Sequence, residues 1–192
     1  MRNIFLLFNV LILLLVFSGC EKPPTEEMEL AQEMVARAEN NADAVNFAGL
    51  TLTRARGALN NMQIEADAKR YEAARTYAAE AVALAERAIE EGMVGAILAR
   101  EEAAALNYSL LTLFEETASA INAAAADGSL DLNVNALSAE LDSARQIYNE
   151  ARQDLLDDNL RDAIAKNQAV RSTLSGINGR ITNAAQAALG KK

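Results

Sequence analysis

The sequence of 192 residues contains no histidine, no tryptophan and a single cysteine, and its only two prolines stand together at Pro23 and Pro24. Without histidine and with one cysteine, the chain cannot form the common zinc sites, a Ser-His or Cys-His nucleophile, or an internal disulfide. Aromatic residues make up 5% of the chain, and it has few of the β-branched and aromatic runs that strands require. A fold built on β-sheets is therefore nearly excluded.

Alanine dominates what is present, with 40 of the 192 positions. Alanine has the highest helix propensity, and no proline interrupts the chain after residue 24. The sequence therefore predicts an all-α fold.

The first 20 residues have the layout of a secretory signal. Arg2 supplies a positive charge, residues 4–17 are apolar except for Asn9, and the segment ends in Ser18-Gly19-Cys20. Such a run is shorter than the roughly 20 residues needed to span a bilayer. We predict a signal peptide over residues 1–19 and removal of that segment.

Phe17-Ser18-Gly19-Cys20 resembles the lipoprotein box of bacteria. The resemblance implies that Cys20 becomes the first residue and carries diacylglycerol and an amide-linked acyl chain, the one lipid group expected and no other cofactor. Glu21, by resemblance to the enterobacterial sorting rule, favours the outer over the inner membrane. An ordinary signal peptide with an incidental cysteine is the alternative.

Negative charge prevails in the part of the chain that follows. It carries 17 basic and 27 acidic side chains, a net charge of −10. Such a balance disfavours nucleic acid as a partner and disfavours docking on anionic lipid by charge alone.

Apolar spacing and helix-breaking residues divide the mature chain into a lipidated tether over residues 20–26 and one helical domain over residues 27–190. Six helices are predicted, with Gly92 closing the third, at residues 26–39, 43–66, 68–91, 94–126, 134–156 and 159–189.

Shifting the chain by 89 residues against itself aligns two similar halves. Val45-Asn46 falls on Val134-Asn135, Leu52 on Leu141, and Ala55-Arg56 on Ala144-Arg145. Two alanine-rich amphipathic helices can also align by chance, but the agreement of the apolar positions favours a duplication. It predicts two helical hairpins joined by the long helix over residues 94–126.

The second helix of each hairpin begins with a large residue followed three positions later by alanine, in Tyr71-Glu72-Ala73-Ala74 and Leu160-Arg161-Asp162-Ala163. With the residues seven and ten positions on (Ala78 and Ala81; Asn167 and Val170), the pattern resembles a tetratricopeptide-type hairpin. It is most similar to alanine-rich helical-hairpin lipoproteins of bacteria, a family whose domain has no assigned function. The period of 89 residues and the absence of a closing proline depart from the tetratricopeptide pattern.

Two helices carry more apolar residues than a hairpin needs. Leu106, Leu111 and Leu113 lie on different sides of helix 94–126, which predicts burial on two sides. The helix over residues 159–189 keeps a heptad from Leu160 to Ala188, which predicts a possible seam for a homo-oligomer.

Carboxylates are the only potentially catalytic side chains that the sequence contains in quantity. Asp154, Asp157, Asp158 and Asp162 cluster at one predicted turn. A divalent cation or an acid–base pair is conceivable there, but acidic residues at a turn are better explained as helix caps. We therefore expect no catalytic residue and no metal site.

Four residues of the first hairpin are candidates for binding a partner: Arg54, Arg70, Arg75 and Tyr77. The arginines concentrate positive charge, and Tyr77 lies off the apolar stripe, where its ring offers rigid contact area. The favoured function is a non-catalytic scaffold that binds an envelope protein. The alternative is a carrier of lipid or another hydrophobic ligand.

Overall fold

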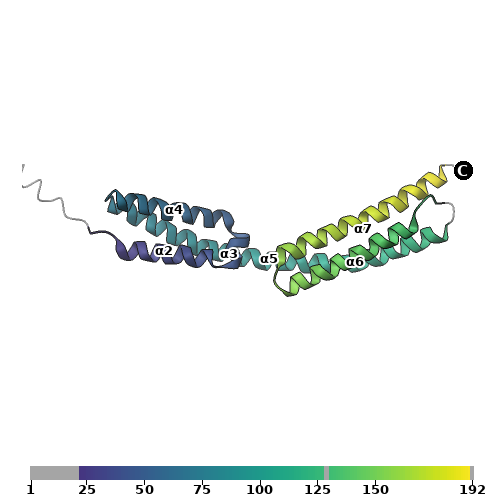
Figure 1. Cartoon of the computed structure of the whole chain (residues 1–192), viewed down its shortest axis with the longest axis horizontal. Coiled ribbons are helices and arrows are strands. Elements are labelled where there is room, and N and C mark those ends of the chain that lie inside the picture. Colours follow the sequence, from purple (N-terminus) through teal and green to yellow (C-terminus); the bar gives the residue numbers. More distant parts are fainter. Residues whose placement is uncertain (1–21, 128–129, 191–192) are drawn as a thin grey trace, which may run out of the picture. The chain divides into compact units, whose positions relative to one another are not determined.

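A computed structural model describes residues 22–127 and 130–190. Its elements are α2 (Thr25–Glu39), α3 (Ala42–Phe47), α4 (Gly49–Asp67), α5 (Tyr71–Ala126), α6 (Val134–Leu156) and α7 (Leu160–Leu189). These ranges contain six helices and no strand, which confirms the all-α prediction (Figure 1). Cys20 and the predicted signal peptide lie outside the described residues.

Two predicted helix boundaries are wrong. The helix expected over residues 43–66 is interrupted at Ala48, whose φ of −122° and ψ of 30° separate α3 from α4. The break expected at Gly92 does not exist, because α5 continues through it as one helix of 56 residues. A glycine that ends a helix usually adopts a positive φ, and none of the described glycines does so.

Gly92 has a packing role instead. A Cβ atom built on it would lie 2.4 Å from the backbone nitrogen of Ala44 in α3. The missing side chain therefore lets the backbone of α3 lie directly against α5. Glycine in a helix interior lowers stability by about 1 kcal/mol relative to alanine, and at position 92 it permits this close contact.

The chain forms two compact units that meet within α5: unit 1 extends to Met93, and unit 2 begins at Val94. The core of unit 1 combines large residues from α2 and α4, such as Val35, Leu52 and Met62, with alanines of α5. Small residues allow helix axes to approach closely, so α5 supplies the flat side of this core.

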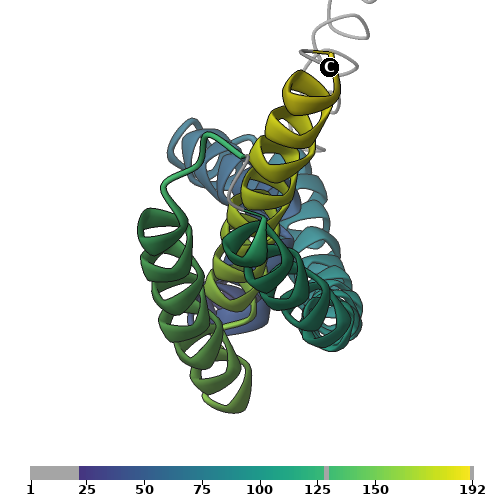
Figure 2. The same ribbon diagram turned by 90° about the vertical axis from the view of Figure 1, so that its right-hand side faces the viewer.

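The core of unit 2 is built from larger side chains on all three of its helices, including Leu110 and Phe114 of α5, Leu141 of α6 and Leu174 of α7. Helices α6 and α7 lie side by side (Figures 1 and 2). The heptad positions of α7 from Leu160 to Ile177 are buried in this core. An oligomer through this heptad would therefore have to use its last positions, Ile181, Ala184 and Ala188, which are half buried.

The two hairpins repeat at the predicted offset. Helices α4 and α6 end 89 residues apart, at Asp67 and Leu156, and α5 and α7 begin 89 residues apart. The turns also match, because Lys69 and Asp158 both adopt a left-handed backbone, with φ of 59° and 65°. In each turn the residue that follows donates its N–H to a helix carbonyl, Arg70 to Glu65 and Asn159 to Asp154.

Unit 2 contains a buried amide at a position where unit 1 has a buried alanine. Asn167, which is fully buried, corresponds to Ala78 and donates from Nδ2 to the carbonyl of Ala103 at 3.4 Å. Its Oδ1 has no hydrogen-bond partner among the described residues. The core at Asn167 is thus polar, and one of its hydrogen-bonding atoms lacks a partner. Such an atom lowers the free energy of unfolding.

We expect Gly92→Ala to lower the free energy of unfolding by about 1–3 kcal/mol, because the new methyl group overlaps the backbone of α3. Gly176→Ala is the matched control, since its Cβ would meet nothing within 4 Å. The control should raise stability by up to about 1 kcal/mol. Urea unfolding followed by circular dichroism compares them, and equal effects of both substitutions would contradict the close contact of α3 with Gly92.

Asn167→Leu should raise the free energy of unfolding by about 1 kcal/mol. The substitution keeps the number and branching of the side-chain heavy atoms and removes a buried carbonyl oxygen without a partner. The same urea experiment measures it. A loss of stability of similar size would show that the amide contributes more than its hydrogen bond to Ala103.

Candidate functional site

Unit 1 carries an apolar groove between α2 and α5. Its volume is about 300 Å³, and it is lined by Glu27, Leu30, Arg75, Ala78, Ala79, Val82, Ala83 and Glu86. The lining residues of α5 recur every three or four positions from Arg75 to Glu86, which corresponds to about 16 Å of helix. We call this surface the α2/α5 groove.

Local sequence explains its form. Alanine side chains at positions 78, 79 and 83 leave α5 shallow beside α2. Leu30 and Val82 supply larger apolar walls, and Leu30 is half exposed. Such a surface can accept an apolar side chain without displacing a core residue.

Charged groups mark the groove. Arg75 Nε lies 3.4 Å from Glu27 Oε1 across the two helices, and the same guanidinium also pairs with Glu72. Glu86 lies three to four residues beyond Val82 and Ala83 on α5 and is exposed. A ligand in the groove would therefore meet an ion pair as well as apolar walls.

Of the four partner-binding candidates from the sequence, Arg75 lines the groove. Tyr77 is half buried and packs against the core of unit 1. Its ring therefore fills space among alanines, which limits what it can offer to a partner.

The other two arginines make local contacts. Arg70 is exposed at the turn and forms two hydrogen bonds with the carboxylate of Glu65, whose pKa it holds below the ordinary value. Arg54 is exposed on α4. Its charge is the smallest of several causes that lower the pKa of Glu91, after the hydrogen bonds from Thr51 and Arg87.

The second hairpin does not reproduce the groove chemistry. The positions equivalent to Arg75 and Tyr77 are Ile164 and Lys166. Lys166 Nζ lies 2.7 Å from Asp154 and 3.6 Å from Glu150, and the hydrogen bond to Asp154 is the main cause that raises its pKa. The two copies therefore present different surfaces on the same backbone.

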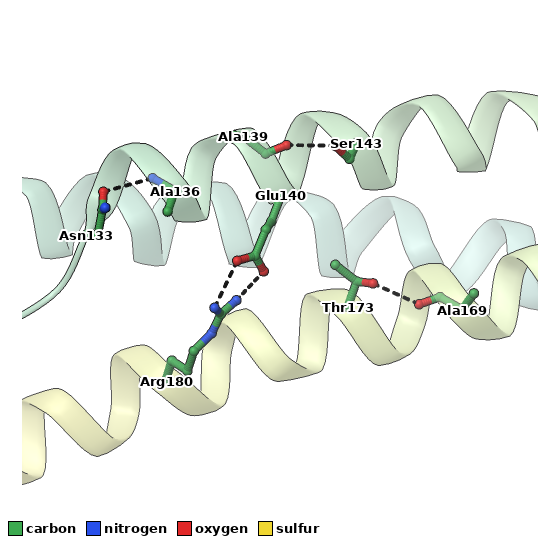
Figure 3. A network of polar contacts seen from close by, with 8 residues as sticks. All are labelled: Asn133, Ala136, Ala139, Glu140, Ser143, Ala169, Thr173 and Arg180. Carbon is green, nitrogen blue, oxygen red and sulfur yellow. Dashed lines mark hydrogen bonds and ion pairs between the residues drawn. The ribbon is translucent and has the colours of Figure 1, made fainter.

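A smaller groove on unit 2 lies between α6 and α7, and sequence reasoning missed it. It has a volume of about 220 Å³ and is lined by Ala139, Glu140, Ser143, Ala144, Ile147 and Thr173. Beside it, Arg180 of α7 donates two hydrogen bonds to the carboxylate of Glu140 on α6 (Figure 3). In the sequence both residues look like ordinary surface charges, because no local pattern relates two residues that are 40 positions apart.

Three of the four acidic residues around the second turn are engaged in side-chain contacts. Asp154 pairs with Lys166, Asp158 with Arg100, and Asp157 accepts a hydrogen bond from Gln153 Nε2 at 3.0 Å. Asn159 stands at the N-cap of α7, and its side chain makes no cap hydrogen bond. Among the described residues, no group of three or more His, Cys, Asp or Glu side chains is placed to hold a metal ion.

Arg180→Gln should raise the pKa of Glu140 toward its ordinary value of 4.5. Arg180, by hydrogen bonding and by charge, holds this pKa low, against a smaller opposing effect of desolvation. Because the folded-state pKa is lowered, the ion pair stabilises the fold above the ordinary pKa and loses its effect as pH falls through the lowered value. NMR titration of the Glu140 carboxyl measures the change.

Arg145→Gln is the control, since Arg145 pairs with Asp142 within α6. It should leave the titration of Glu140 unchanged. If Arg180→Gln also left it unchanged, the contact drawn in Figure 3 would not persist in solution.

Within the described ranges, no helix combines the length and apolarity required to cross a bilayer. Comparisons with protein-family models, with curated proteins and with solved structures find no match to this chain. The functional argument therefore depends on the geometry of the chain itself.

Proposed function

We propose that the chain is a lipid-anchored, non-catalytic protein of the bacterial cell envelope, which binds other envelope proteins through its helical hairpins. The observation that carries this proposal is the α2/α5 groove, an open apolar surface bordered by the Glu27–Arg75 ion pair. Apolar contact area next to a few polar groups is the usual composition of a recognition surface. The relation to tetratricopeptide-like lipoproteins is part of the same proposal.

The composition of the groove supports binding over catalysis. Its lining contains five alanine, leucine and valine side chains and three charged ones, of which Arg75 and Glu27 pair with each other. An acid–base catalyst would require a carboxyl whose pKa is strongly shifted by its site. The lowered pKa values of Glu65, Glu91 and Glu140 follow from surface contacts with arginine or threonine.

The predicted lipid on Cys20 supports an envelope role. An acylated protein is confined to the membrane surface, which raises the effective concentration of any partner held there. With Glu21 after the cysteine, the outer membrane is the proposed location. The acidic surface makes proteins more suitable partners than nucleic acid.

Groove binding can be tested by mild cross-linking of the full lipidated chain in its native cells, followed by pull-down and mass spectrometry. Ala83→Glu places a charge in the groove at an exposed helical position, so the fold should be retained. We expect recovery of the partner to fall about tenfold, because binding would bury the new carboxylate. Cys20→Ala should reduce recovery by removing the anchor.

Ala123→Glu is the matched control, an identical substitution at an exposed alanine of the same helix in unit 2. Recovery should stay at the level of the unsubstituted chain. If lipid or another small apolar molecule is recovered without protein, the carrier function replaces the scaffold. Equal recovery from Ala83→Glu and Ala123→Glu would remove the groove from the proposal.

A further inference from the structure

The outer face of α5 in unit 2 is apolar over residues 94–111. Five large apolar residues stand on it about half exposed or more: Val94, Ile97, Leu98, Tyr108 and Leu111, with exposed fractions from 48% to 78%. Ala104 and Ala105 lie between them and are also exposed. At 1.5 Å per residue this face extends for about 25 Å.

This face lies opposite the side of α5 that enters the core. Ala99, Ala103 and Leu110 are buried and follow one another at helical spacing, whereas Val94, Leu98 and Ala105 recur on the other side of the helix. The prediction of burial on two sides is therefore wrong for this helix, since Leu111 is 48% exposed. Of the three leucines that suggested it, Leu113 packs against the core of unit 2 and Leu106 is half buried, whereas Leu111 lies on the exposed face.

Glu101 stands in the middle of the outer face. Successive helical residues are separated by about 100°, which places position 101 between the directions of Val94 and Tyr108. The side chain is exposed, and it makes no ion pair or hydrogen bond with the described residues. Its neighbour Arg100 points its charge to Asp158 instead.

We propose that residues 94–111 of α5 bind a basic amphipathic helix of another protein. Leu or Ile side chains on that helix would cover the apolar residues at three- and four-residue spacing, and one Lys or Arg among them would pair with Glu101. The alanines at 104 and 105 allow two helix axes to approach closely. This inference rests on the proposed scaffold function and specifies a partner class for it.

Charge argues against the other occupants. In a parallel pair of identical helices Glu101 would face Glu101, and in an antiparallel pair centred on the face the same side chains would lie within one turn of each other. Like charges at such distances oppose association. An anionic membrane surface is disfavoured by Glu101 and by the net charge of the chain, −9 over its full length.

The test is photo-cross-linking in native cells, with a benzophenone amino acid in place of Leu98 in the full lipidated chain. The same probe at Leu30 reports on the α2/α5 groove, and the probe at Leu50, exposed on α4, is the background control. We expect the Leu98 probe to give an adduct whose sequenced peptide has apolar residues at helical spacing and Lys or Arg among them. The Leu50 probe should not give it.

Charge reversal then tests the recognition itself. Glu101→Lys should reduce the yield of the Leu98 adduct about tenfold. Glu80→Lys, the matched reversal at an exposed glutamate of α5 in unit 1, should leave it unchanged. Circular dichroism confirms that both variants keep their helix content.

The inference would be overturned if the Leu98 probe gave no adduct, or if its adduct were with a second copy of the chain, with lipid or with an acidic segment. It would also be overturned if Glu101→Lys left the yield of the Leu98 adduct unchanged. If the Leu30 probe gives a protein adduct while Leu98 gives none, this partner class is wrong and the scaffold function stands. If neither probe captures a protein, both proposals fail.

Discussion

One stripe of buried residues on α5 is the constraint on which the fold depends. It starts at Ala74 and proceeds by steps of three and four residues to Ala124, passing through Gly92 without a gap. The first part of α5 supplies its buried residues to the core of unit 1, and the second part supplies them to the core of unit 2.

The composition of this stripe changes along the helix, and the surfaces change with it. In unit 1 the stripe is alanine apart from Gly92, so α2, α3 and α4 supply the bulk of the core and approach α5 closely. The same shallowness leaves the α2/α5 groove beside them. In unit 2, Leu110, Phe114 and Ile121 fill the core from α5 itself, and the ring of Phe114 meets that of Tyr148 edge to face, with centroids 5.4 Å apart. The two hairpins thus share a backbone arrangement and distribute the side-chain volume differently.

The sequence was sufficient for features that depend on periodicity. Helix type, the offset of 89 residues and the buried positions of α4, α6 and α7 all follow from apolar spacing. It was insufficient where a contact between distant residues decided the outcome. Gly92 looks like a helix end until α3 lies against it, and Leu111 looks like a core residue until the direction of the core is known. Lys69 and Asp158 carry no sequence sign of a left-handed turn, because neither is glycine.

The same distinction between local patterns and contacts of distant residues applies to the candidate site residues. Arg75 was selected for its charge and does line a groove, but the opposite wall, Glu27 and Leu30, comes from a helix more than 40 positions away, and local spacing cannot find that match. Arg70 and Tyr77 were selected by the same reasoning and have partners within their own unit, at Glu65 and in the core. A charge or an aromatic ring in a helical sequence therefore indicates a surface only after its neighbours across the bundle are known.

The position of the groove along the chain limits where its partner can be. Glu27 is seven residues after Cys20, and an extended chain advances at most about 3.6 Å per residue. With Cys20 acylated, the backbone of Glu27 stays within about 25 Å of the anchored residue. A partner bound in the groove must therefore reach the membrane surface, which favours another membrane-attached protein, or a periplasmic domain held close to the bilayer, over a freely diffusing one.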